Sequence, residues 1–299
     1  DVGLPDGDAL DILPKLQKNN PNLKIIVMSA RTTLLTAVRA EKKGAFEYLP
    51  KPFDLDELLN LVSSTFSKPK IAKIKQVNNI PKSIYDSGPV IGKSTAMQEI
   101  YKIISRIVNT NFSVLISGDS GTGKKLIAKS IHDLSSKTNK FFINLDANFF
   151  NDNSSNGSIE RINNFTSINI KDVNDLSGSS IYIKNINEFT DVQQKNLLNF
   201  IENGLTQLFP ENSNLEKTRI FVSTKTNIVN DVEKGLFRED LYYRLNVVPI
   251  KLPSLKDRFE DIPDLASSFL KINYNNKLIN RTISYDGMNL LKEYSWPGN

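Results

Sequence analysis

The sequence predicts an α/β fold in two domains, because short apolar runs suited to buried parallel strands alternate with segments of helical apolar spacing. The chain has 299 residues, of which 39% are hydrophobic and 24% are charged, a composition that supports packed cores. No run approaches the ~18 apolar residues of a membrane span. The chain has no Cys and a single His, His132. These counts exclude disulfides, a thiol nucleophile and a His or Cys metal cluster.

Charge divides the chain into three segments. Residues 1–67 carry a net charge of −1, residues 68–85 contain five Lys and no acid, and residues 86–299 carry +1. The lysine-rich stretch contains prolines and lacks periodicity, so we interpret 68–89 as a basic linker between domains at 1–67 and 90–299. A phosphate-binding stripe is the alternative, but no aromatic residue lies among the lysines.

In the first domain, the apolar run Lys24–Met28 predicts a buried strand between helices. Asp54 with Glu57 three positions later is typical of a capped helix start. The helices expected here are Asp8–Leu16, Thr32–Lys43 and Asp54–Phe66.

In the second domain the same alternation recurs, and the polar stretch Asn148–Asp175 is expected to form a mobile loop. The expected strands are Ser113–Ser117, Phe141–Leu145, Ser180–Ile183, Arg219–Ser223 and Val247–Lys251. The expected helices are Lys124–Leu134, Asp191–Glu202, Asp261–Asn273 and Tyr285–Tyr294.

Three polar residues of the first domain stand near predicted strand ends. Asp1 precedes a turn-rich loop, Ser29 follows the 24–28 strand, and Lys51 follows another short strand. Since parallel strands end at one edge of a sheet, we expect the three to meet there. A carboxylate nucleophile with a hydroxyl and an ammonium to hold phosphoryl oxygens suits an aspartyl phosphate. Ordinary surface charges are the alternative interpretation.

Three stretches of this domain resemble the second half of a response-regulator receiver domain, which has a flavodoxin-like fold. They are Asp1–Gly7 (DVGLPDG), Met28–Ala30 (MSA) and Gly44–Phe53 (GAFEYLPKPF). The resemblance implies a phosphoacceptor at Asp1, a switch hydroxyl at Ser29, a switch aromatic at Tyr48 and an essential lysine at Lys51. It also implies a cis bond between Lys51 and Pro52.

The resemblance further implies a Mg²⁺ ion bound by Asp1 and the backbone carbonyl of Gly3. In that family the other ligands come from an acidic pair on a first strand, which these residues lack. We therefore expect that this half-domain, as it stands, cannot be phosphorylated.

A glycine-rich turn in the second domain follows a predicted strand and opens a predicted helix, which is the context of a P-loop. Its backbone N–H groups and the helix N-terminus favour phosphate, and Lys124 would reach the β- and γ-phosphates of ATP. A purely structural loop is the alternative. The predicted nucleotide-binding residues of this turn are Gly118, Asp119, Ser120, Gly121, Thr122, Gly123, Lys124 and Lys125.

The residues that would hydrolyse the nucleotide are replaced. A P-loop offers Ser or Thr to Mg²⁺ where this chain has Lys125. After the strand 180–183, Lys184 and Asn185 stand where a hydrolase has Asp and Glu. A cation cannot ligate a cation, and an amide cannot act as a general base. We expect ATP to be bound but hydrolysed poorly or not at all.

The second domain as a whole resembles the AAA+ domain of NtrC-type enhancer-binding regulators. The resemblance implies adenine packing near Ile91 and Gly92, and arginine fingers, Arg238 and Arg244, offered to a neighbouring subunit of a homo-oligomer. Without it, the two arginines would be interpreted as helix-surface charges. The matching blocks are Val90–Lys93 (VIGK), Gly118–Lys125 (GDSGTGKK), Gly235–Val247 (GLFREDLYYRLNV), Leu252–Leu255 (LPSL), Arg258–Pro263 (RFEDIP) and Trp296–Asn299 (WPGN).

Departures from that family point to its NtrX branch in a degenerate form. The GAFTGA loop that grips the sigma-54 factor is missing from Phe149–Leu176, which argues against a sigma-54 contact. Asp146 stands where the family places an Asn that restrains the catalytic Glu. The sequence ends at Asn299, before the family's sensor arginine and helix-turn-helix, so any DNA contact would come from a region not in this chain.

Three functional hypotheses follow. The first is a cytoplasmic, NtrX-like response regulator with a sensor histidine kinase as partner and an AAA+ module that binds ATP without efficient turnover. The second is a working ATPase that remodels the sigma-54 holoenzyme, which the fold and Arg238 and Arg244 favour. The third is a remnant of a split or decaying gene, because residue 1 is Asp and both ends of the family pattern are missing. We favour the first.

Overall fold

The computed structural model describes residues 2–4, 7–30, 32–67, 90–135, 140–151, 162–163, 170, 172–203, 218–225, 227–273 and 282–299. The predicted linker 68–89 and Asp1 lie outside the described residues. Contacts divide the chain into two compact units, the first comprising Asp1–Asn109 with Arg258–Tyr294 and the second Thr110–Asp257 with Ser295–Asn299. No helix among the described residues is long and apolar enough to cross a membrane.

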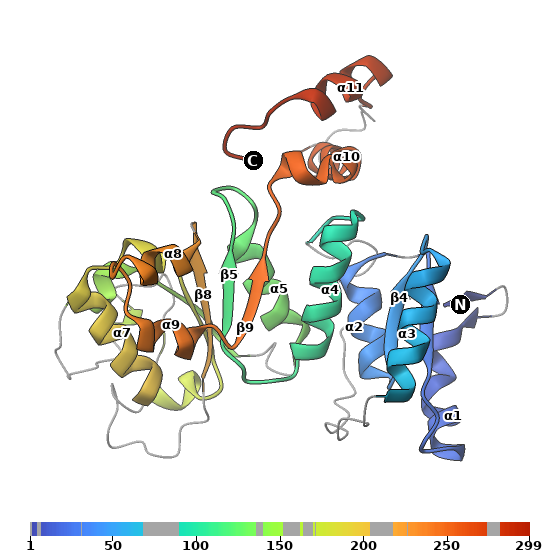
Figure 1. Cartoon of the computed structure of the whole chain (residues 1–299), viewed down its shortest axis with the longest axis horizontal. Helices are drawn as coiled ribbons and strands as arrows, with labels where there is room; N and C mark the ends of the chain where they lie inside the picture. The colour runs from blue at the N-terminus through green and yellow to red at the C-terminus, as the bar shows by residue number, and fades with distance from the viewer. Residues whose placement is uncertain are drawn as a thin grey trace. The chain divides into compact units, whose positions relative to one another are not determined.

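The second unit contains a five-stranded sheet in the order β6-β7-β8-β5-β9 (Figure 1). Its strands are β5 (Val114–Ser117), β6 (Phe142–Leu145), β7 (Ser180–Ile183), β8 (Arg219–Thr224) and β9 (Val248–Lys251). All neighbouring pairs are parallel, with Ser117 opposite Thr224 and Ile183 opposite Val222. The carboxyl ends of β5, β7 and β8 therefore open on one edge, where such sheets bind ligands. The predicted α/β class is confirmed.

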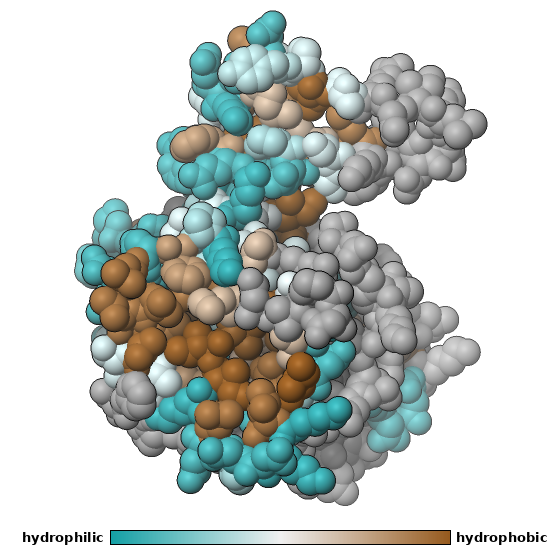
Figure 2. Space-filling model, turned by 90° about the vertical axis from the view of Figure 1, so that its right-hand side faces the viewer, coloured by the Kyte–Doolittle hydropathy of each residue, from teal (hydrophilic) through white to brown (hydrophobic). Residues whose placement is uncertain are grey.

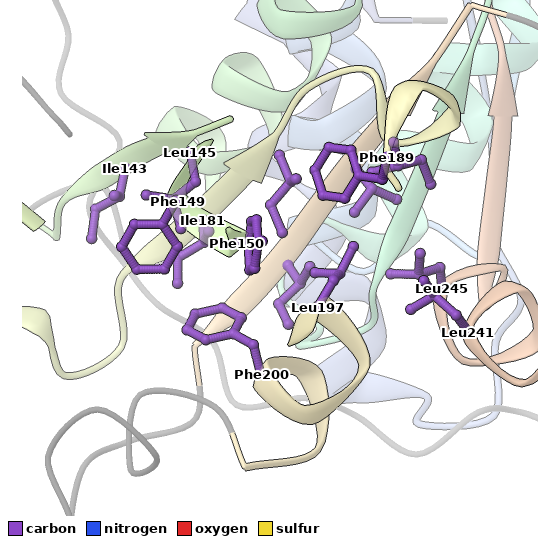
Figure 3. Close-up of a cluster of buried hydrophobic side chains, with 14 of the residues drawn as sticks. Ile143, Leu145, Phe149, Phe150, Ile181, Phe189, Leu197, Phe200, Leu241 and Leu245 are labelled. Atoms are coloured by element: carbon purple, nitrogen blue, oxygen red, sulfur yellow. The ribbon is translucent and has the colours of Figure 1, made fainter. Parts of the chain in front are cut away.

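Helices pack on this sheet around an aromatic core. The elements are α5 (Lys124–Leu134), α7 (Asp191–Asn203), α8 (Ile228–Glu233) and α9 (Glu239–Leu245), with short 3-10 turns η2 (Ala147–Phe150), η3 (Val173–Leu176) and η4 (Ile186–Glu188). Phe149, Phe150 and Phe200 meet edge-on, with ring centroids 5.2 to 6.2 Å apart (Figure 3). Such contacts stabilise a core beyond the burial of area alone.

The expectation of a mobile loop over Asn148–Asp175 is wrong for the parts that the structure describes. Phe149, Phe150, Ile162 and Ile170 are buried in the main apolar cluster of this unit. The stretch is mostly polar, so its few apolar residues did not predict an ordered segment. Their burial removes hydrophobic area from water and fixes the backbone at these residues.

The first unit contains two small sheets. Strands β1 (Gly3–Leu4) and β2 (Gly7–Asp8) are antiparallel, whereas β3 (Ile26–Ser29) and β4 (Glu47–Pro50) are parallel. Its helical elements are η1 (Ala9–Asp11), α1 (Leu13–Asn19), α2 (Leu34–Lys42), α3 (Leu55–Ser67), α4 (Thr95–Ile107), α10 (Ile262–Asn273) and α11 (Tyr285–Glu293). Asp54 accepts the N–H of Glu57 at 2.7 Å, which confirms the predicted helix cap.

Helix α4 was not among the predicted helices. Its buried side chains Met97, Ile100, Tyr101 and Ile104 recur at the three- and four-residue spacing of one helical face. The helix packs against α2.

Asp261 ties the start of α4 to the 3-10 turn η6 (Leu255–Asp261). Its fully buried carboxylate accepts the backbone N–H groups of Lys93 and Ser94 at 2.6 and 2.7 Å, and the Ser94 hydroxyl at 2.8 Å. Three donors to one carboxylate offset the cost of burying its charge. The contact joins the VIGK and RFEDIP blocks, which lie far apart in the sequence.

The N-terminal part of the first unit presents apolar surface. Figure 2 shows brown side chains gathered on one face, and Ile12, Leu16 and Leu23 are among the exposed large hydrophobic residues. Among the described residues, β3 pairs only with β4. Two strands make little core of their own, and part of the apolar surface of this region stays exposed.

Candidate functional site

The turn between β5 and α5 has the backbone conformation of a phosphate-binding loop. Gly118, Gly121 and Gly123 have φ values of +151°, +82° and +97°, a region that favours glycine. The loop begins where the Gly118 N–H donates to the Thr224 carbonyl at 3.3 Å. It is closed by the Thr122 hydroxyl, which donates to the Asp119 carbonyl at 2.8 Å. The N-terminus of α5 thus adjoins a loop that favours an anion.

Lys124 lies folded over this loop. Its Nζ donates to the carbonyls of Gly118 and Asp119, both at 2.6 Å, and the residue is 9% exposed. Burial lowers the pKa of Lys124, the Asp119 carboxylate raises it, and the Lys225 ammonium lowers it further. The Lys124 ammonium is therefore held at the P-loop, where the Lys225 ammonium also acts on it.

The three residues that replace hydrolytic groups, Lys125, Lys184 and Asn185, lie beyond the carboxyl ends of β5 and β7. Lys125 is exposed on the first turn of α5. Lys184 follows β7, and its Nζ lies 3.8 Å from a carboxylate oxygen of Asp146. Asn185 has a φ of +53°, and its N–H donates to the Ser223 hydroxyl at 3.3 Å. The Asn185 side-chain amide donates to Glu188 at 3.5 Å.

These residues do not fit a catalytic Mg²⁺ ion. Mg²⁺ takes oxygen ligands in octahedral geometry, whereas Lys125 and Lys184 present ammonium groups. The nearby carboxylates of Asp146 and Glu188 are already ion-paired with Lys184 and Lys225. Within the described ranges, no group of three or more His, Cys, Asp or Glu side chains is placed to hold a metal ion.

Sequence reasoning missed Lys225. It follows β8, the strand beside β5, and its Nζ lies 2.6 Å from a carboxylate oxygen of Glu188. Its position two residues after a predicted strand, Arg219–Ser223, was a usable signal, because the ends of neighbouring parallel strands converge.

The WPGN block lies against the P-loop. The Asn299 side chain donates to the Ser120 carbonyl at 2.9 Å and accepts the Leu255 N–H at 2.5 Å. A Cβ atom added at Gly121 would come within 2.0 Å of the Gly298 carbonyl oxygen. The approach of these two backbones therefore requires glycine at position 121.

Arg238 is the N-cap residue of α9, and Arg244 lies in the last turn of this helix. The buried side chains of α9 are Leu241 and Leu245 (Figure 3). Arg238 is paired with Asp240 at 2.6 Å, and Arg244 with Glu202 at 3.4 Å. Both arginines are about half exposed. Their role as arginine fingers stays a prediction.

Ile91 and Gly92, the residues expected near adenine, belong to the first unit, whereas the P-loop belongs to the second. Both are partly buried. Their adenine contact stays a prediction.

In the first unit the structure brings Ser29 and Lys51 together at adjacent strand ends. The Lys51 N–H donates to the Ser29 carbonyl at 2.8 Å, and the predicted cis bond between Lys51 and Pro52 is confirmed. The Ser29 and Tyr48 hydroxyls are hydrogen-bonded, and burial raises the pKa of Tyr48 to about 12. Gly3 lies in β1. The phosphoryl roles of these residues stay predictions.

Comparison with known families gives two matches. The response regulator receiver domain matches residues 1–63, and the Sigma-54 interaction domain matches residues 90–251. The second match alone covers more than half of the chain.

Curated relatives of this chain include DNA-binding transcriptional regulators named NtrC. The DNA-binding transcriptional regulator NtrC of Rhizobium meliloti (strain 1021) is 34% identical over 305 residues, which cover 100% of this chain and 62% of that protein. NtrC of Azospirillum brasilense is 37% identical over 312 residues, covering 100% of this chain and 63% of that protein. The chain thus spans less than two thirds of the length of these relatives.

Solved structures of NtrX are also similar to this chain. NtrX from Brucella abortus in complex with ATP superposes with a TM-score of 0.56 at 27% identity, covering 100% of this chain and 66% of that one. The same protein in complex with ADP gives 0.55 at 28% identity, covering 98% and 66%. With the matched domains and relatives, these similarities show that the chain belongs to the NtrC family of two-component response regulators, close to NtrX.

Proposed function

We propose that this chain is part of an NtrX-like response regulator whose AAA+ module binds ATP and hydrolyses it poorly or not at all. One observation carries the proposal: the P-loop and Lys124 are in place, while Lys184 and Asn185 occupy the end of β7. The similar NtrX structures with ATP and ADP support nucleotide binding by the same fold.

ATP would be held by the loop and by Lys124. Backbone N–H groups of the glycine-rich turn and the N-terminus of α5 attract phosphate oxygens. The Lys124 ammonium now donates to two carbonyls, and phosphate oxygens would replace them as stronger, charge-assisted acceptors. The phosphate groups of the bound nucleotide would give Lys124 negatively charged acceptors in place of the neutral carbonyls.

Hydrolysis needs a base that orients and deprotonates water, and the site does not supply one. The Asn185 amide has no proton affinity at neutral pH, and its backbone is held in the left-handed region by the bond to Ser223. The carboxylate of Asp146 is ion-paired with Lys184 at 3.8 Å.

Without turnover, nucleotide would act as a structural ligand. A ligand that binds only the assembled state favours that state by mass action, and we propose a homo-oligomer in which Arg238 and Arg244 face a neighbour's γ-phosphate. Their present partners, Asp240 and Glu202, are themselves about half exposed. Such ion pairs are worth only about 0–1 kcal/mol, so a phosphate could displace them.

For the receiver, we propose a sensor histidine kinase as partner and Asp1 as phosphoacceptor, with Ser29 and Lys51 holding the phosphoryl oxygens. Mg²⁺ would be bound by Asp1 and the Gly3 carbonyl together with acids that precede Asp1, and when bound it would shield charge on the incoming phosphoryl group. We place the regulator in the cytoplasm. In protein that includes the preceding residues, acetyl phosphate should label the wild type but not Asp1→Asn; equal labelling would overturn this assignment.

ATP binding is tested with a fluorescent ATP analogue. We expect Lys124→Ala to weaken binding at least tenfold, since it removes charge-assisted bonds, and Lys195→Ala, which removes an exposed charge on α7, to leave it unchanged. No phosphate should be released above the Lys124→Ala level. Binding that ignores Lys124, or brisk Mg²⁺-dependent release, would contradict the proposal.

A further inference from the structure

Four lysines of the second unit follow the carboxyl ends of three adjacent strands, β5, β8 and β7. Lys124 and Lys125 open α5 after β5, Lys225 follows β8, and Lys184 follows β7. Because β7, β8 and β5 are adjacent and parallel, all four residues start from the same edge of the sheet.

Two hydrogen bonds join the ends of these three strands. The Gly118 N–H donates to the Thr224 carbonyl at 3.3 Å, which places Lys225 beside the first residue of the P-loop. The Asn185 N–H donates to the Ser223 hydroxyl at 3.3 Å, which holds the end of β7 to the end of β8. The electrostatic effect of Lys225 on Lys124 fits this arrangement.

The carboxylates of this edge are Asp119, Asp146 and Glu188. Asp146 is paired with Lys184 at 3.8 Å and Glu188 with Lys225 at 2.6 Å. All four partners are at least a third exposed, with side-chain exposures between 35% and 58%. Exposed pairs of this kind hold their partners weakly, so a multiply charged phosphate chain can take both lysines.

We propose that this site binds the polyphosphate of ATP without a divalent metal ion, with the ammonium groups of Lys184 and Lys225 neutralising the charge that Mg²⁺ neutralises in working P-loop enzymes. This proposal rests on the proposed ATP binding and names the groups that neutralise the bound phosphates. Fixed ammonium groups neutralise phosphate oxygens but provide no open coordination position that could activate water. Binding and loss of hydrolysis then have one cause, the exchange of metal ligands for cations.

Metal-free ATP should then be the preferred ligand of this site. A Mg²⁺ ion bound to ATP removes two negative charges from the phosphate chain and adds a cation that Lys125 and Lys184 repel. The affinity measured in EDTA should therefore equal or exceed the affinity measured in millimolar Mg²⁺.

The test is the dissociation constant of ATP by titration calorimetry, for the full chain, in EDTA and in Mg²⁺. In EDTA, Lys184→Ala and Lys225→Ala should each weaken binding roughly tenfold, whereas Lys195→Ala serves as a charge-matched control in the same unit and should not. Circular dichroism shows whether each variant is folded. A variant that fails to fold is replaced by Lys184→Gln or Lys225→Gln, which keep a polar side chain with part of the aliphatic stem and remove only the charge.

The outcomes separate the two proposals. Binding in EDTA at least as tight as in Mg²⁺, and weakened by the Lys184 and Lys225 variants, supports metal-free recognition. Binding that Mg²⁺ strengthens, or that both variants leave unchanged, overturns metal-free recognition while ATP binding itself stands. Absence of binding in both conditions overturns both.

Discussion

The Nζ atom of Lys184 lies 3.8 Å from the carboxylate of Asp146, across the adjacent ends of β7 and β6. The family resemblance implies Asp at position 184 and Asn at position 146. Here the first position has become positive and the second negative, so the change at 146 offsets part of the change in charge at 184. A carboxylate restored at 184 alone would face the carboxylate of Asp146, and like charges at that distance repel.

Restoring hydrolysis should therefore require Asp146 to change as well. We expect the variant Lys125→Thr, Lys184→Asp, Asn185→Glu, Asp146→Asn to release phosphate from ATP in the presence of Mg²⁺, at least tenfold faster than wild type, because it regains oxygen ligands and a base. The three-site variant that keeps Asp146 should be slower. A colorimetric phosphate assay measures both rates, and no gain in the four-site variant would show that other residues cause the loss.

The buried carboxylate of Asp261 should be essential to the stability of the first unit. Asp261→Ala leaves the N–H groups of Lys93 and Ser94 without their acceptor, and we expect a loss of about 3 kcal/mol in the free energy of unfolding. Asp264→Ala is the matched control, because Asp264 pairs with Lys93 in an exposed ion pair; it should change stability by less than about 0.5 kcal/mol. Urea denaturation measures both, and equal effects would contradict the assigned role.

His132 should make the second unit less stable in mild acid. Its Nδ1 lies 2.9 Å from the Ser180 hydroxyl and its Nε2 lies 3.0 Å from the Lys140 carbonyl, and burial lowers its pKa below the ordinary 6.5. The neutral ring is therefore favoured in the folded state. Its contribution is complete above pH 6.5 and is lost as the pH falls through the lower, folded-state pKa.

Since the chain has a single histidine, its NMR titration can be followed without ambiguity. We expect a pKa below 6.5 in the folded protein. Between pH 7.5 and 5.5, the free energy of unfolding should fall more for wild type than for His132→Gln. A folded-state pKa at or above 6.5 would contradict this expectation.

Gly121→Ala should disturb the WPGN block, whereas Gly123→Ala should not. Both residues have positive φ, so each substitution carries a backbone cost of about 1–3 kcal/mol. Only at position 121 does the added Cβ meet backbone, 2.0 Å from the Gly298 oxygen; at position 123 the nearest atom is 4.0 Å away. Trp296 is the only tryptophan, so its emission should shift in Gly121→Ala alone. A shift in both variants would place the cause in the loop itself.

Local sequence patterns predicted helices and strands well where both ends of the element carried a signal. The bounds of α5 and β7 agree with the sequence prediction at both ends, because a glycine-rich turn precedes one and a run of four buried residues makes the other. Helix α4 carried a readable apolar spacing and was overlooked. The short helices α8 and α9 are held by tertiary contacts of buried Ile228, Leu241 and Leu245, which local propensity does not contain.

The sequence predicted which residues lie at the site, but it did not predict which residues contact one another there. The P-loop, Lys184 and Asn185 follow from motif and register. The pairing of Lys225 with Glu188 joins residues 37 positions apart, and the bond from Lys93 to Asp261 joins residues 168 positions apart. Such long-range partners are fixed by packing of the whole unit, so they could not be predicted from one sequence.

If this chain holds ATP without cleaving it, the nucleotide recovered from the protein after incubation should be ATP. Protein would be incubated for an hour with ATP and Mg²⁺, separated from free nucleotide, denatured, and its bound nucleotide identified by chromatography. We predict ATP, in an amount that Lys124→Ala abolishes. Recovery of ADP as the main bound species, with free phosphate in proportion, would contradict the account.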